Sequence, residues 1–135
     1  MVFGTFDGFH GGHFDFFKQA RELSKNSFLI VSIARNKNIK IIKKNFPFLS
    51  EQKRMTLIKR CILVDKVVLS GINNYIVHIV RENPDIIALG YDQTFYVENL
   101  KKDLENKDIF PKIIRLKPYR EEVFKNYLLK KRKKV

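Results

Sequence analysis

The chain opens with the stretch VFGTFDGFHGGHFDFFKQA (Val2–Ala20), in which four glycines and two histidines separate a short apolar segment from a phenylalanine-rich one. Glycine loses more backbone entropy on folding than any other residue, so a cluster of glycines is typical of a chain that passes close to a ligand or to its own backbone. The apolar start predicts a strand, and the stripe Phe16, Phe17, Ala20 and Leu23 predicts a helix. The stretch therefore predicts a strand, a glycine-rich turn and a helix.

Four later segments have the composition expected of buried strands, because they are short, β-branched and apolar on both faces. They are Phe28–Ala34, Asp65–Ser70, Asp85–Gly90 and Lys112–Leu116. Helical patterns alternate with them. Ser50 is placed to N-cap a helix that buries Met55, Ile58 and Cys61, and Ile76, Ile79 and Val80 mark a helix that ends before Pro84. Two more helices are predicted, at residues 97–105 and 121–132. Alternating strands and helices indicate an α/β fold with a parallel sheet covered on both faces.

The length, net charge and cysteine content of the chain indicate what kind of protein to expect. The 135 residues are expected to form one domain, 1–135, with a basic tail at about 130–135, and the formal net charge of +13 favours an anionic partner. Cys61 is the only cysteine, so it cannot form an intramolecular disulfide and is interpreted as a small core residue. The start lacks a signal-peptide pattern, and apolar runs stay short of the roughly 20 residues of a membrane span. We expect a cytoplasmic protein.

The glycine-rich turn lies where a ligand is expected. In doubly wound sheets, ligands bind at the carboxyl ends of strands, and the N-terminus of the following helix attracts anions such as phosphate. His10 and His13 are three residues apart, so they share one face of the first turn if the helix begins by Gly11. Neither a dinucleotide GxGxxG motif nor a P-loop is present. Chelation of zinc by the two histidines stays open, although Cys61 and His78 have no metal-binding motif around them.

The segment GTFDGFHGGH (Gly4–His13) resembles the GTFD-x-x-H-x-G-H signature of the cytidylyltransferase-like nucleotidyltransferases. The resemblance continues through FPFLSEQKRM and LVDKVVLS, and PDIIALGYDQ is most similar to the archaeal-type FAD synthetases. Glycerol-3-phosphate cytidylyltransferases are nearer in pattern than phosphopantetheine adenylyltransferases. This resemblance implies a Rossmann-like doubly wound five-stranded parallel sheet in the order 3-2-1-4-5, and a homodimer.

The resemblance also implies a reaction. The phosphate of an acceptor attacks the α-phosphorus of a nucleoside triphosphate and releases pyrophosphate, with Mg²⁺ bridging the phosphates. The favoured substrates are ATP and FMN, which would give FAD. Two alternatives stay open: a CTP-dependent cytidylyltransferase for glycerol-3-phosphate or a similar alcohol phosphate, and a module that binds a nucleotide or RNA without catalysis. A membrane is not expected as a partner, and nucleic acid is disfavoured.

Roles of single residues are likewise implied by the resemblance. His10, His13 and Lys43 are expected to be catalytic, with Lys44 as the alternative to Lys43. The main chain and side chains expected to hold the nucleotide are Gly4, Thr5, Phe6, Gly12, Gly90, Asp92, Arg120, Lys125 and Asn126. Asp7 and Tyr91 are expected to bind the acceptor, and Phe9, Phe95 and Tyr96 are candidates for stacking on a flavin. Asp92 could instead cap the following helix.

The chain departs from the family pattern near its C-terminus. The family has a Ser/Thr cluster in an R-x-x-x-I-S-T-T pattern, whose hydroxyl groups help to hold the triphosphate. Counting from Arg120, those positions hold Phe124, Lys125, Asn126 and Tyr127. Lys125 and Asn126 are still able to bind phosphate, but the hydroxyl donors are absent.

Overall fold

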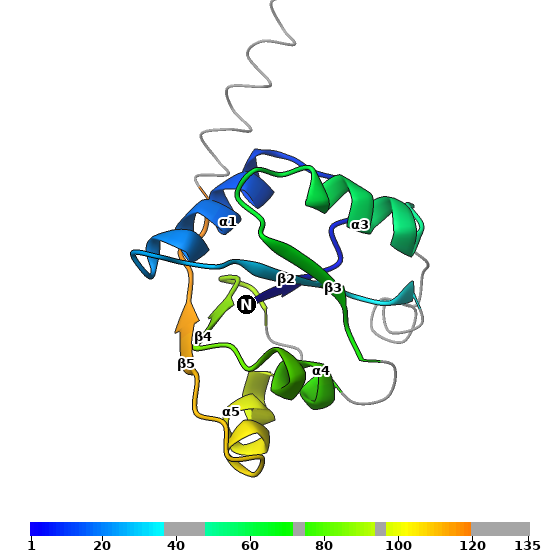
Figure 1. Cartoon of the computed structure of the whole chain (residues 1–135). Coiled ribbons are helices and arrows are strands. Elements are labelled where there is room, and N and C mark those ends of the chain that lie inside the picture. Colours follow the sequence, from blue (N-terminus) through cyan, green and yellow to red (C-terminus); the bar gives the residue numbers. More distant parts are fainter. Residues whose placement is uncertain (37–47, 72–74, 94–96, 120–135) are drawn as a thin grey trace, which may run out of the picture.

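The computed structural model describes residues 1–36, 48–71, 75–93 and 97–119 (Figure 1). The helix predicted at 121–132 and the basic tail lie outside these residues. The described elements follow in the order β1 (Val2–Gly4), α1 (Gly11–Glu22), β2 (Ile30–Ile33), α3 (Glu51–Lys59), β3 (Lys66–Leu69), α4 (Tyr75–Glu82), β4 (Ile86–Leu89), α5 (Val97–Glu105) and β5 (Lys112–Arg115). The five predicted strands are confirmed, as are the helices predicted within the described ranges.

The strands pair in parallel, in two sheets. One sheet has the order β1-β2-β3, and the other consists of β4 and β5. Two hydrogen bonds of Met1 join the sheets: its amino group donates to the carbonyl of Ile86 over 2.8 Å, and its carbonyl accepts from the N–H of Ala88 over 3.0 Å. The parallel α/β fold is thus confirmed, whereas a single five-stranded sheet is not. With only three residues, β1 offers few backbone groups for a longer ladder with β4.

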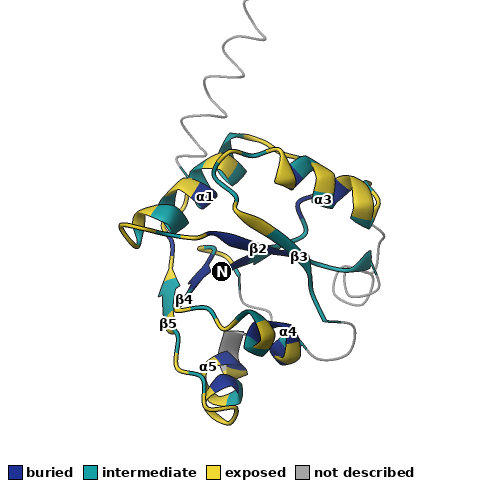
Figure 2. Cartoon of the chain, in the orientation of Figure 1, coloured by how far each residue is buried: buried dark blue, intermediate teal, exposed yellow. Residues whose placement is uncertain are grey.

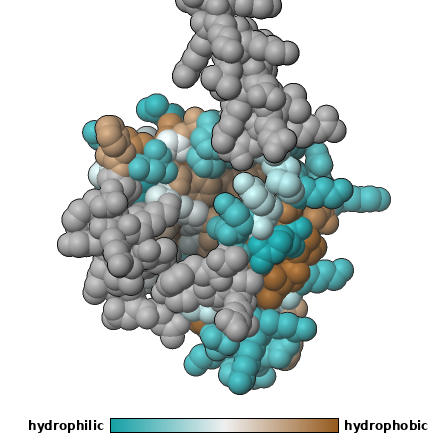
Figure 3. Space-filling view, turned by 180° about the vertical axis from the view of Figure 1, so that it is seen from behind, coloured by the Kyte–Doolittle hydropathy of each residue, from teal (hydrophilic) through white to brown (hydrophobic). Residues whose placement is uncertain are grey.

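Helices cover both faces of the strands. In Figure 1, α1 and α3 lie on one side, and α4 and α5 lie on the other. The side chains of β2 alternate accordingly: Val31 and Ile33 belong to the core cluster that contains Phe17 of α1, and Ile30 belongs to the cluster that contains Ile79 of α4. The buried residues line these two interfaces (Figure 2), while the face seen in Figure 3 carries both hydrophilic side chains and hydrophobic patches. The fold therefore has three layers.

Helix ends follow the sequence signals. The Ser50 hydroxyl accepts a hydrogen bond from the N–H of Lys53 over 3.2 Å, which confirms it as the N-cap of α3. Cys61 follows the C-cap Arg60, so it lies just beyond the helix and packs half-buried against the core. Among the helices that the structure describes, none has the length and apolar character required to cross a membrane.

His78 is a core residue. It is 5% exposed on α4, and its Nε2 lies 2.8 Å from the hydroxyl oxygen of Ser32 on β2. The ring of Phe3 meets it edge-on, with centroids 6.1 Å apart. Burial lowers the pKa of His78 below its ordinary value, so the ring is a neutral hydrogen-bond partner inside the helix–sheet interface.

Candidate active site

The glycine-rich turn connects the carboxyl end of β1 to α1, and its backbone is unusual. Phe6 has φ 53°, and Gly8 has φ 145°. A positive φ is uncommon for a non-glycine residue and carries a strain of about 1–3 kcal/mol. The Phe6 side chain is 5% exposed, and a Cβ on Gly4 would come within 2.7 Å of its ring. At Gly4, therefore, the space left by the missing side chain holds the ring of Phe6.

The two histidines meet at the start of α1. His10 is the N-cap, and its Nδ1 accepts a hydrogen bond from the N–H of Gly12 over 3.0 Å. The Nδ1 of His13 in turn accepts from the N–H of His10 over 3.4 Å. The rings stack with centroids 3.8 Å apart, so the expectation that both histidines share one face of the first turn is confirmed. Because each Nδ1 accepts a hydrogen bond, Nε2 is the ring nitrogen that carries the proton in both histidines.

The environment of His13 keeps its ring neutral. Burial, and secondarily the adjacent His10, lower the pKa of His13 to about 4. The ring of Phe6 meets it edge-on at 5.3 Å, and Phe9 lies at 6.0 Å. At neutral pH, His13 is therefore a hydrogen-bond donor through Nε2 and carries no positive charge.

The GYDQ corner (Gly90–Gln93) follows β4 and is tied to β1. The Gln93 side chain accepts from the N–H of Gly90 over 2.7 Å and donates to the carbonyl of Phe3 over 2.8 Å. Nη1 of Arg115 donates to the carbonyls of Gly90 and Gln93 over 2.8 and 2.9 Å. These bonds bring the GYDQ corner next to the glycine-rich turn, at the carboxyl ends of β1 and β4.

Two predicted site residues of the GYDQ corner lie on its surface. Tyr91 is 49% exposed, and Asp92 is exposed as well. The structure describes α5 from Val97 onward, and the residues between Gln93 and Val97 lie outside the described ranges, so the capping role expected for Asp92 stays a prediction. Both side chains are thus accessible to a ligand at this end of the strands.

Asp7 and Arg54 connect the glycine-rich turn to the start of α3. The Asp7 carboxylate accepts from the N–H groups of Phe48 and Leu49 over 2.5 and 2.6 Å. Arg54 is 0% exposed, and its Nη1 donates to the carbonyls of Thr5 and Ala34 over 2.8 and 2.7 Å. Arg54 was not among the residues predicted to form the site, although its spacing of four residues from Ile58 places both on one buried face of α3.

Several predicted site residues fall outside the described ranges. They are Lys43 with its neighbour Lys44, Phe95, Tyr96, Arg120, Lys125 and Asn126. Among the described site residues, His10 and His13 stack on each other at the end of the glycine-rich turn, and the GYDQ corner is hydrogen-bonded to β1 at Phe3.

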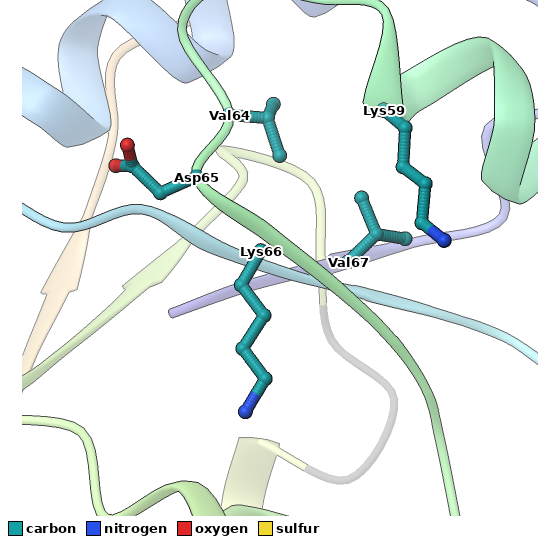
Figure 4. A pocket seen from close by; sticks show the side chains of 5 residues that line it. All are labelled: Lys59, Val64, Asp65, Lys66 and Val67. Carbon is teal, nitrogen blue, oxygen red and sulfur yellow. The ribbon is translucent and has the colours of Figure 1, made fainter.

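A pocket of about 470 Å³ lies elsewhere, at the amino end of β3 (Figure 4). It is lined by Lys59, Val64, Asp65, Lys66 and Val67. The Asp65 carboxylate is held there by Arg21 at 2.6 Å, and the Lys66 ammonium by Glu82 at 2.7 Å. In a parallel sheet this edge is opposite the carboxyl ends, so the pocket is separate from the paired histidines.

The fold and the paired histidines at a helix N-terminus define a nucleotide-binding α/β protein of the nucleotidyltransferase class. A sequence model described as cytidylyltransferase-like matches residues 1–131, so the chain belongs to the cytidylyltransferase-like family. Similar relatives include the FAD synthase of Methanothermus fervidus, 37% identical over 122 residues (90% of this chain, 83% of the relative), and that of Thermococcus sibiricus, 42% identical over 117 residues (86% and 77%).

A solved structure resembles the fold closely. The crystal structure of the lipopolysaccharide core biosynthesis protein from Thermoplasma volcanium superimposes with a TM-score of 0.80 at 31% identity. The match covers 88% of this chain and 95% of that one. The family resemblance inferred from Gly4–His13 is confirmed by the cytidylyltransferase-like match and by the FAD synthase relatives.

Proposed function

We propose that the protein is an FAD synthase, which transfers the AMP moiety of ATP to the phosphate of FMN and releases pyrophosphate. The observation that carries nucleotidyl transfer is the stacked His10–His13 pair at the N-terminus of α1. The acceptor is supported by the curated relatives named FAD synthase, which match most of both chains.

The proposed chemistry is a direct displacement. A phosphate oxygen of FMN forms a bond to the α-phosphorus of ATP, and the bond from that phosphorus to the oxygen of the β-phosphate breaks. The attacking group is already an anion, so the protein supplies position and hydrogen bonds and needs no nucleophile of its own. The Nε2–H groups of His10 and His13 donate to the oxygens on which negative charge develops. The positive end of the α1 dipole acts in the same direction.

Magnesium fits this site as a cation carried by the phosphates. Among the described residues, no three His, Cys, Asp or Glu side chains come together as a ligand set. The Asp7 carboxylate is turned toward two main-chain N–H groups. Since Mg²⁺ is commonly bound through substrate phosphates, the ion would neutralise the triphosphate with few protein ligands.

The proposal assigns the remaining contacts by resemblance. The main chain of Gly4, Thr5, Phe6 and Gly12 holds the triphosphate, and the GYDQ corner, with Gly90, Asp92 and Tyr91, faces the base and the acceptor. The sheet order 3-2-1-4-5 is supported by the two hydrogen bonds between Met1 and β4. A homodimer and a cytoplasmic location are carried over from the resemblance.

Pyrophosphate release tests the function. The full chain is incubated with Mg²⁺ and each nucleoside triphosphate in turn, with FMN, with glycerol-3-phosphate or without an acceptor. We expect release only with ATP and FMN, accompanied by FAD in chromatography. Release with CTP and glycerol-3-phosphate would establish the cytidylyltransferase alternative. Nucleotide binding without release under any condition would establish the non-catalytic module.

A further inference from the structure

Phe6 has a strained backbone conformation, and its ring contacts His13, a proposed catalytic residue. Its φ of 53° is the left-handed conformation that favours glycine, and its buried ring meets His13 edge-on at 5.3 Å. The same ring lies 5.4 Å from that of Phe17. Such a conformation persists only where neighbouring contacts fix the backbone on both sides. The location of the His13 ring therefore depends on what fixes Phe6.

Both neighbours of Phe6 are tied to Leu49, just before α3. On one side, the carbonyl of Thr5 accepts from Nη1 of the buried Arg54 over 2.8 Å, and Nε of the same arginine donates to the carbonyl of Leu49 over 3.3 Å. On the other side, the Asp7 carboxylate accepts the N–H of Leu49 over 2.6 Å. Each residue that flanks Phe6 is thus joined to one peptide segment of the chain.

Arg54 also anchors the end of β2. Its Nη1 donates to the carbonyl of Ala34 over 2.7 Å, and its Nη2 donates to Oδ1 of Asn36 over 2.7 Å. A guanidinium with no exposed surface is costly unless its donors are satisfied, and here Nε, Nη1 and Nη2 all donate. Burial lowers the pKa of Arg54, and the negative charges of Glu51 and Asp7 act in the opposite direction, in favour of the charged form. Arg54 therefore links the glycine-rich turn, the end of β2 and α3 through hydrogen bonds.

We propose that Asp7 and Arg54 form a latch that holds Phe6 in its left-handed conformation and thereby positions the ring of His13. The kinetic test of this inference rests on the proposed function. It makes Asp7 a positioning residue and replaces its expected role as a ligand of the acceptor. The two short bonds from consecutive N–H groups orient the carboxylate toward the main chain of Phe48 and Leu49.

The two roles of Asp7 differ in what a substitution changes. Asp7→Asn keeps the shape of the side chain but loses the charge and one acceptor oxygen, so one of the two short bonds is broken. A displaced latch misplaces His13 in the transition state, so we expect kcat to fall about tenfold to a hundredfold while KM for FMN changes less than about twofold. An acceptor ligand would instead raise KM for FMN.

Amide hydrogen exchange tests the latch without substrates. In Asp7→Asn we expect the N–H groups of Phe48 and Leu49 to exchange at least about tenfold faster, while that of Leu89 in β4 is unchanged. Asp108→Asn is the matched control, because Asp108 is exposed and its φ of 59° is one that asparagine tolerates. If the Asn variant does not fold, Asp7→Glu, which keeps the charge but displaces the oxygens, is measured in the same way.

The two experiments separate the possible failures. Unchanged exchange at Phe48 and Leu49, or an increase confined to KM for FMN, would overturn the latch. A wild-type protein that makes no FAD would instead contradict the proposed function, and the exchange measurement would still decide whether the latch exists. Faster exchange together with lower kcat is the result that supports it.

Discussion

The imidazole rings of His10 and His13 stack with their centroids 3.8 Å apart and their planes inclined by 22°. Two positive charges at such a distance would repel each other strongly, and the lowered pKa of His13 removes one of them at neutral pH. Each Nδ1 accepts a main-chain N–H, which leaves Nε2 as the donor. The pair therefore presents two hydrogen-bond donors, one on each ring, at the N-terminus of α1.

Replacing His10 separates its capping role from its chemical role. His10→Ala removes both the cap of α1 and the Nε2 donor, so we expect a loss of about 1 kcal/mol in the free energy of unfolding and a fall in turnover of about two to four decades. His10→Asn keeps a good N-cap but lacks the imidazole. It should regain most of the stability and little of the activity. Denaturant titration and FAD formation measure the two effects, and equal activity in His10→Asn and wild type would contradict the assigned role.

His13 should make stability depend on pH in a defined window. Its pKa is about 4 in the folded protein and near 6.5 in the unfolded chain, so the unfolded state binds more protons between these values. Stability should therefore decrease as pH falls from 6.5 to 4. His13→Asn should show a shallower decrease, measured as the free energy of unfolding at several pH values. Since His78 is present in both proteins, its own lowered pKa cancels in the comparison. If the free energy of unfolding changes with pH in the same way in wild type and His13→Asn, His13 is solvated in the folded protein.

Replacing Gly12 by alanine should disturb the stacked His10–His13 pair while the protein still folds. A Cβ at this position would lie 2.8 Å from Cε1 and 3.0 Å from Nδ1 of His10, so the ring must move and lose its bond to the helix. Alanine favours the helix by about 1 kcal/mol over glycine, which offsets the lost cap. We expect Gly12→Ala to fold and to lose about two decades of turnover. In a His10→Asn background, Gly12→Ala should reduce turnover much less. Fully additive effects of the two substitutions on turnover would contradict this explanation.

Local patterns were sufficient to predict the elements of the fold. Short apolar segments predicted every strand, and Ser50 predicted the start of α3 because capping depends on residues only three positions apart. The pairing of the histidines was predictable for the same reason, since both lie in one helical turn. These features depend on sequence-local physics, and the structure reproduces them.

Contacts between distant segments could not be predicted in the same way. Arg54 is one of 27 lysines and arginines in the chain, and no local pattern shows that it bonds Thr5 and Ala34 across the fold. Gln93 likewise joins the GYDQ corner to Phe3, 90 positions away in the sequence. The division into two sheets depends on the shortness of β1, which a strand pattern does not reveal. Such partners are set by tertiary geometry and leave no local signal.

Lys43 and Lys44 supply a prediction about how the polyphosphate of ATP is bound. From the family resemblance, we expect Lys43 to contact the triphosphate and not the base. Lys43→Ala should therefore weaken binding of ATP by about tenfold, of ADP less, and of AMP hardly at all, because the lost attraction increases with phosphate charge. Lys44→Ala is the matched control and should leave all three affinities nearly unchanged. Calorimetric titration of the three nucleotides decides, and the reverse ranking of the two variants would assign the role to Lys44.

The acceptor and the base can be tested at the GYDQ corner. Tyr91 is 49% exposed beside a turn that Gln93 and Arg115 hold against β1, so its ring is available to stack on an isoalloxazine without giving up a core contact. Tyr91→Leu removes the aromatic face but keeps an apolar side chain. We expect KM for FMN to rise about threefold to tenfold, with KM for ATP unchanged. Phe110→Leu is the control for losing an exposed aromatic ring, because Phe110 is 72% exposed and precedes the amino end of β5.

Calorimetry with ATP, CTP and FMN tests which base and which acceptor the protein binds. Adenine and cytosine offer similar donor and acceptor edges, so the number of hydrogen bonds does not separate them. Binding of CTP at least tenfold tighter than ATP, a difference of about 1.4 kcal/mol, together with no signal for FMN, would overturn the flavin assignment and favour the glycerol-3-phosphate type.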